Sequence, residues 1–143
     1  MLSVTCKAAI KAVIYLGSKY NSGEKSGIKE IAEFIYENEH TVAKLLQKLV
    51  KANIINSSKG PNGGFYITKE QTQQKVITIV EAIDGADVFK KCGLGLSKCS
   101  ETKPCPFHNE YKPIRELFRT MCNNKKISEL QQKVNTGVAY LIG

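Results

Sequence analysis

The chain has 143 residues, enough for one domain or one small domain with an appendage, and 42% of them are hydrophobic. That apolar share excludes wholesale disorder, while the formal net charge of +8 favours a polyanionic partner such as nucleic acid. No apolar run approaches the roughly 18 residues of a membrane span. Lys7 and Lys11 interrupt the apolar start at helical spacing, which favours a buried helix over a signal peptide. We therefore expect a cytoplasmic protein that has no membrane partner.

Three segments of the first half have the apolar period of an amphipathic helix. They are residues 1–17, 28–35 and 40–54, with polar breaks at 21–27 and 36–40. The last two, joined by a turn, predict a helix-turn-helix whose second helix directs Lys44, Lys48 and Lys51 outwards. An ordinary helical hairpin with a solvated basic face would explain these helices equally well.

The segment that follows, residues 53–68, predicts a β-hairpin. Two strand-like runs, NIINSS and GFYIT, are separated by KGPNGG, whose proline, asparagine and glycines suit a hairpin tip. A helix-turn-helix followed directly by a hairpin is a winged helix, in which the second helix enters the major groove. Lys59 at the base of the tip suits a phosphate contact, and Gly63 and Gly64 let the backbone approach closely.

The second half predicts more helices around a cysteine-rich loop. They are residues 75–91, ending near Gly85, 111–124 and 127–142. The helix at 111–124 carries an apolar stripe of Ile114, Leu117, Phe118 and Met121. That stripe suits a dimer seam, although it could instead pack on the core of its own subunit. We expect a mainly α fold with a hairpin wing: a DNA-binding domain at 1–75, and the cysteine loop and dimerisation helices at 76–143, as one compact unit.

The loop KCGLGLSKCSETKPCPFH, residues 91–108, has the spacing C-x6-C-x5-C-x2-H. Its candidate metal ligands are Cys92, Cys99, Cys105 and His108. Thiolates are soft ligands that favour iron–sulfur clusters, zinc or cuprous copper. A structural zinc site fits the ligand count, and an iron–sulfur cluster would give the redox chemistry of a switch. A disulfide would leave one cysteine over and is disfavoured in a reducing cytosol.

The order AVIYL, LLQKLVKANII, SSKGPNGGF and cysteine cluster makes the chain resemble a family of winged-helix transcription regulators. Its types are the iron–sulfur cluster regulator IscR and the nitric-oxide-responsive repressor NsrR, and the resemblance covers nearly the whole chain. It implies a homodimer that binds a palindromic operator on double-stranded DNA, with a cluster, 2Fe–2S first, near the dimer interface. The DNA-contacting residues that we expect are Asn38, Glu39, His40, Thr41, Ala43, Lys44, Lys48, and on the wing Lys59 and Pro61.

The fourth ligand is the open detail of this cluster. Similarity to IscR points to His108, whereas members resembling NsrR use an acidic residue near the N-terminus of the partner subunit. This chain has Lys7 at that place, which cannot ligate while charged. Cys6 beside it could reach across a dimer or be a buried small hydrophobe, and Cys122 is predicted to pack. Six residues separate Cys92 from Cys99, whereas five separate the first two cysteines in the best-known members. This difference bears on the cluster type and on the fourth ligand.

The resulting hypothesis is a regulator, a repressor by resemblance, in which cluster gain, loss or oxidation repositions the two recognition helices. The main alternative is a cluster-free winged-helix regulator controlled by thiol oxidation or a partner protein; relatives resembling CymR lack these cysteines altogether. An enzyme is not expected. The chain has only 2 histidines, no Ser-His-Asp order, no phosphate-cradling loop and no H-x-E with P-C-x-x-C pattern of a zinc deaminase.

Overall fold

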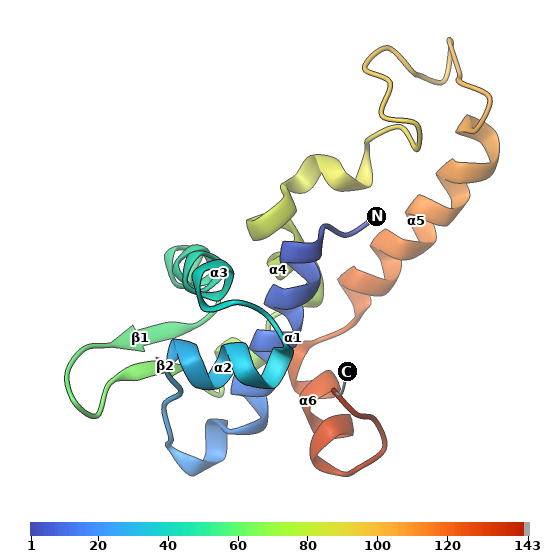
Figure 1. Cartoon of the computed structure of the whole chain (residues 1–143). Coiled ribbons are helices and arrows are strands. Elements are labelled where there is room, and N and C mark those ends of the chain that lie inside the picture. Colours follow the sequence, from blue (N-terminus) through green and yellow to red (C-terminus); the bar gives the residue numbers. More distant parts are fainter. Residues whose placement is uncertain (142–143) are drawn as a thin grey trace.

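In a computed structural model that describes residues 1–141, the chain forms a mainly helical body, a small wing and a projecting arm (Figure 1). The α-helices are α1 (Val4–Ser18), α2 (Ile28–Ile35), α3 (Glu39–Lys51), α4 (Val76–Asp84), α5 (His108–Asn124) and α6 (Ile127–Asn135). The strands are β1 (Asn56–Ser58) and β2 (Gly64–Tyr66), and the 3-10 turns are η1 (Tyr20–Ser22), η2 (Gln71–Gln73) and η3 (Ala86–Phe89). The predicted fold class is confirmed. None of the described helices has both the length and the apolarity that crossing a membrane requires.

The main hydrophobic core lies among α1, α2, α3 and the base of the wing. α1 contributes small residues, such as Ala8 and Ala12, that let neighbouring helices come close, and Leu45 of α3 is fully buried. Burial of a leucine of this kind stabilises the fold by about 1.5–3 kcal/mol. Ile79 of α4 and Ile127 of α6 enter the same core, so residues before and after the wing share it.

The wing is an antiparallel hairpin in which Asn56 pairs with Tyr66 and Ser58 with Gly64. Its strands are shorter than predicted, because the isoleucines before β1 are buried in the core. The segment predicted as a loop adds a third edge: Ser26 and Phe65 exchange backbone hydrogen bonds of 2.9 and 2.8 Å. Gly64 has a φ of +140°, and a Cβ there would lie 2.9 Å from the Ser26 carbonyl oxygen. The close approach it permits is therefore to the chain's own backbone.

The arm consists of α5 and the cysteine loop, residues 90–107, at its outer end (Figure 1). α5 begins at His108, slightly earlier than predicted, and α6 then returns to the body. The prediction that the last helix reaches residue 142 is wrong. α6 ends at Asn135, and Gly137 follows with a φ of +73°, a left-handed conformation that commonly terminates helices. Residue 142 lies outside the described residues.

A second, smaller core joins the arm to the body. The ring of Phe118 on α5 lies 5.9 Å from that of Phe89, and Cys122 packs with Cys6 of α1 and with α4. Burial raises the pKa of Cys122, and burial and then Asp84 raise the pKa of Cys6 to about 12. Both thiols are therefore neutral packing groups, as predicted for Cys122, and Cys6 is not available as a ligand from this position.

Candidate metal centre and nucleic-acid interface

The candidate recognition helix α3 is started by a side-chain cap. The Asn38 Oδ1 accepts a hydrogen bond of 2.8 Å from the Thr41 backbone N–H, and Asn38 itself has extended backbone angles. This satisfies one of the N–H groups that a helix start leaves unpaired. The Asn38 side chain is therefore engaged within the protein, whereas Glu39 beside it is exposed.

The other predicted DNA contacts lie on two neighbouring elements. His40, Lys44 and Lys48 are exposed and follow one another at four-residue spacing, so they form one stripe along α3. Thr41 and Ala43 beside this stripe are half-buried, and Lys59 and Pro61 are exposed at the tip of the wing. α3 and the wing lie on the side of the body away from α5 (Figure 1). Their contacts with DNA remain predictions.

Replacing Asn38 with alanine is expected to lower the free energy of unfolding by about 1 kcal/mol, the usual cost of losing such a cap. Denaturant titration measures this directly. Asn38→Ser is the matched control, because a serine oxygen can accept the same hydrogen bond. Equal stability of the alanine variant and the wild type would show that the cap contributes nothing.

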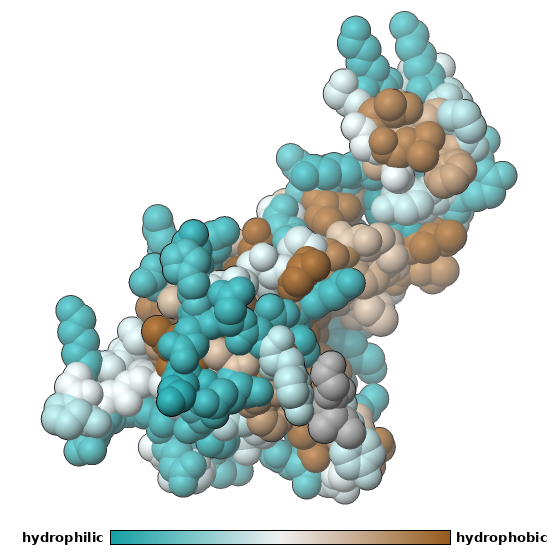
Figure 2. Space-filling view, in the orientation of Figure 1, coloured by the Kyte–Doolittle hydropathy of each residue, from teal (hydrophilic) through white to brown (hydrophobic). Residues whose placement is uncertain are grey.

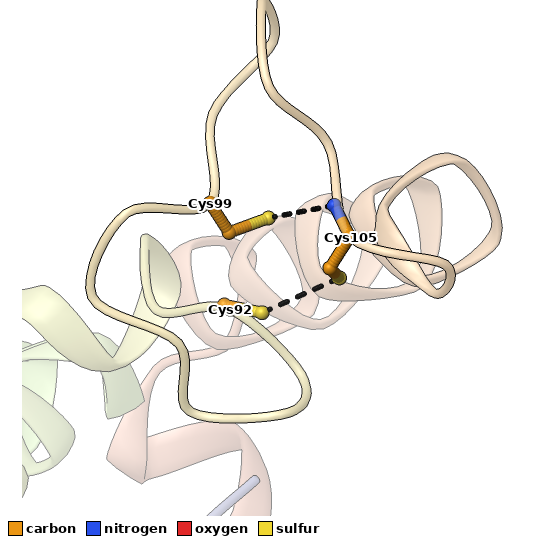
Figure 3. Close-up of side chains that lie close together, drawn as sticks. All are labelled: Cys92, Cys99 and Cys105. Atoms are coloured by element: carbon orange, nitrogen blue, oxygen red, sulfur yellow. Dashed lines mark hydrogen bonds between the residues drawn. The ribbon is translucent and has the colours of Figure 1, made fainter.

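The three cysteines of the loop meet at one point (Figure 3). Their Sγ atoms all lie within 4.8 Å of one another, and those of Cys92 and Cys105 are 3.5 Å apart. Backbone N–H groups point at the sulfurs: Cys105 donates to Cys99 Sγ and Leu94 to Cys92 Sγ, each at 3.4 Å. A loop without regular secondary structure thus brings its thiols together and supplies them with hydrogen-bond donors.

His108, the predicted fourth ligand, adjoins this group at one edge. Its Nδ1 lies 3.3 Å from Cys99 Sγ, whereas the mutually close set contains the three cysteines only. Its Nε2 is buried, has no hydrogen-bond partner among residues 1–141, and lies 3.7 Å from a carboxylate oxygen of Glu101. The structure therefore places all four predicted ligands together, and their binding of a metal remains a prediction.

The backbone of the loop favours a thiolate at one cysteine. The N–H groups of Leu96 and Leu94 lower the pKa of Cys92 to about 7. At Cys99 the backbone N–H of Cys105 acts in the same direction, but desolvation and the neighbouring thiols outweigh it and raise the pKa. A thiol must lose its proton before it binds a metal, so the lowered pKa of Cys92 favours its role as a ligand.

One face of α5 holds the loop in place, and sequence reasoning missed most of its residues. The Arg115 guanidinium donates to the carbonyls of Lys90 and Lys91 at 2.9 and 2.8 Å. Gly93 lies so close to Tyr111 that a Cβ would stand 2.8 Å from the ring. The polar residues His108, Lys112 and Arg115 recur at helical spacing, which was the available signal.

Most of the predicted apolar stripe lies on the surface. Ile114 is 53% exposed, Leu117 71% and Met121 52%, so these three do not pack on the core of their own subunit. Phe118 is half-buried and packs against Phe89, which is the alternative that the sequence left open for this stripe. Figure 2 shows hydrophobic surface along the arm, where Phe107 is also exposed.

Known proteins share both the sequence pattern and the fold. Residues 2–133 match the family model Rrf2, described as an iron-dependent transcriptional regulator. A protein of Aquifex aeolicus (strain VF5), assigned as an HTH-type transcriptional regulator, is 28% identical over 132 residues, covering 91% of this chain and 90% of its own.

Two solved structures have the same fold. CymR, the global cysteine regulator of B. subtilis, gives a TM-score of 0.74 at 17% identity, covering 92% of this chain and 96% of its own. T. potens IscR gives a TM-score of 0.71 at 18% identity, covering 98% of this chain and 92% of its own. Identities this low show the fold alone. Together with the family match they confirm the resemblance to winged-helix regulators and the expectation that the chain is not an enzyme.

Proposed function

The chain belongs to the Rrf2 family of transcriptional regulators, and on that premise we propose that an iron–sulfur cluster switches its DNA binding. Cys92, Cys99 and Cys105 hold the cluster, with His108 as fourth ligand and 2Fe–2S as the type. The observation that carries the proposal is the meeting of three thiol sulfurs within 4.8 Å of one another on a DNA-binding fold.

The residues present fit such a group. Thiolates are the ligands that iron–sulfur clusters prefer, and N–H groups aimed at the sulfurs, as from Leu94 and Cys105, are a usual means of tuning them. A histidine ligand generally donates a hydrogen bond from its second ring nitrogen to a carboxylate or another acceptor. A carboxylate oxygen of Glu101 lies 3.7 Å from His108 Nε2. When bound, the cluster supplies reversible electron transfer and sensitivity to oxidants.

A homodimer completes the proposal. The exposed residues Ile114, Leu117 and Met121 would meet the same residues of a second copy across a twofold axis. A twofold dimer presents two α3 helices to a palindromic operator, whose half-sites are spaced by about one helical turn. Small shifts between the subunits then change the affinity for DNA. We assign DNA reading to residues 1–75, and sensing and dimerisation to residues 76–143.

The route from the loop to the DNA runs through the α5–α6 turn. The Lys125 carbonyl accepts a hydrogen bond of 2.8 Å from Val76 N–H, and Ile127 N–H donates to the Gln74 carbonyl at 2.9 Å. The Gln74 side chain donates in turn to the carbonyl of Asn53, just after α3, at 3.3 Å. In this proposal a change in the loop tilts α5, and these bonds pass the movement to the end of the recognition helix.

A thiol switch is the second candidate. The Sγ atoms of Cys92 and Cys105 lie 3.5 Å apart, and a disulfide bond between them would have a length of about 2.0 Å. Structural zinc on three cysteines and a histidine is the third. Iron, sulfide and zinc analysis of anaerobically purified protein, with a visible spectrum, separates the three. We expect iron and sulfide in matching amounts. Colourless protein with stoichiometric zinc would make the loop structural, and metal-free protein would leave the thiol switch.

A further inference from the structure

Gln71 is a buried polar residue to which neither the cluster nor the DNA-contacting set assigns a role. It opens η2, just after the wing, and is 8% exposed. Its carboxamide forms a reciprocal pair with that of Asn56: Asn56 Nδ2 donates to Gln71 Oε1 and Gln71 Nε2 donates to Asn56 Oδ1, each at 3.0 Å. Two parallel hydrogen bonds of this kind fix both the distance and the orientation of their partners.

The same carboxamide also holds the recognition helix and the second strand. Gln71 Nε2 donates to the carbonyl of Asn53 at 3.3 Å, and Gln71 Oε1 accepts from the Thr68 N–H at 3.0 Å. Asn53 follows α3 in a left-handed conformation with a φ of 59°, Asn56 begins β1, and Thr68 follows β2. One side chain thus joins the end of the recognition helix to both strands of the wing.

The Gln74 side chain also donates to the carbonyls of Asn53 and Ile54, at 3.3 and 3.4 Å, but both acceptors lie between α3 and β1, so these bonds reach neither strand of the wing. Ile54, Ile55 and Ile67 are buried at the same junction, but hydrophobic contacts are not directional. The strands are three residues long, and a hairpin so short is marginal by itself. The direction of the wing relative to α3 therefore depends on the hydrogen bonds of Gln71, together with the pairing of Ser26 and Phe65 at its far edge.

We propose that Gln71 is a positioning residue for DNA binding, which sets the wing so that Lys59 reaches a phosphate while α3 occupies the major groove. The inference rests on the proposed DNA contacts and is independent of the cluster. It predicts that loss of the carboxamide removes the contribution of Lys59 and leaves that of Lys44 on α3 unchanged. A general loss of stability would affect both contributions alike.

The test is a double-mutant cycle on a duplex that the wild-type protein has selected from a random-sequence pool. Affinity is measured by fluorescence anisotropy over a range of salt concentrations. In the wild type, Lys59→Ala should weaken binding several-fold and reduce the slope of log K against log salt by about 0.9, as for one lost phosphate contact. Gln71→Leu, which keeps the apolar bulk, should weaken binding to a similar degree.

The decisive result is how the effects combine. Lys59→Ala should have almost no further effect in the Gln71→Leu protein, whereas Lys44→Ala should have its full effect in either background. Gln73→Leu, the same change at an exposed residue of η2, is the matched control and should bind like the wild type. Should Gln71→Leu unfold, Asn56→Ala removes the wing side of the pair and should show the same loss of the Lys59 effect.

Additive effects of Gln71→Leu and Lys59→Ala, in protein with a normal thermal transition, would overturn the inference. So would a Gln71→Leu affinity equal to that of Gln73→Leu. A wild-type protein that selects no duplex would instead overturn the proposed DNA contacts themselves, and the inference with them.

Discussion

Replacing any one of Cys92, Cys99 and Cys105 with alanine is expected to remove the proposed cluster, lowering bound iron and sulfide by at least about tenfold. Loss of a ligand should cost more than loss of a residue behind one, which itself lowers metal affinity by roughly 10–100-fold. No other cysteine can take its place, because Cys6 and Cys122 are buried in the core that joins the arm to the body. Colorimetric iron and sulfide analysis, with the visible spectrum, measures the loss.

The matched control is Cys122→Ala, which removes a thiol from the same chain but from the small core. It should keep the full iron and sulfide content and lower the free energy of unfolding by about 1 kcal/mol, as is typical of a buried substitution. Wild-type iron and sulfide in the Cys92, Cys99 or Cys105 variant would contradict the proposed ligand set.

Replacing Leu117 with glutamate is expected to convert the proposed dimer into a monomer. Leu117 is the most exposed residue of the stripe on α5, and its replacement would place a carboxylate against its own copy across the twofold axis. A charge buried without a partner is strongly destabilising. Affinity for a palindromic duplex should fall by at least about 100-fold, because the two half-sites are then bound independently. Analytical ultracentrifugation measures the change of mass.

Arg119→Glu introduces the same side chain at another exposed position of α5, two residues further along and on a different face. This variant should remain a dimer. A wild-type protein that sediments as a monomer at micromolar concentration, or a Leu117→Glu variant that stays dimeric, would contradict the assigned seam.

The helical part of the fold could be predicted because its signals are local. The apolar faces of α1, α2 and α3 repeat every three or four residues, and each buries that face in one core. Turn residues predicted the wing in the same way. The pairing of Ser26 with Phe65 could not be predicted, because it joins segments far apart in the sequence and the segment around Ser26 has the composition of a loop. At the C-terminus the apolar run predicted a longer helix, but Gly137 ends it.

The cysteine spacing predicted which side chains would meet, but not what holds them. Arg115 and Tyr111 support the loop only because one particular face of α5 turns towards it, and that depends on the packing of Phe118. The apolar period of α5 alone cannot separate a residue that faces the core from one that faces a second copy. The role of Gln71 could not be predicted either, because a polar residue after a hairpin is equally typical of a linker.

In the proposed function, the state of the cysteine loop sets the affinity of the protein for DNA. The most direct test measures the affinity of one anaerobically purified preparation for the duplex that it selects, before and after the iron is removed with a chelator. We expect a change of about tenfold or more, within the usual 5–150-fold range of coupling between two sites. Cys99→Ala protein should show no change under the same treatment. Equal affinity of the wild type before and after iron removal would contradict control of DNA binding by the cysteine loop.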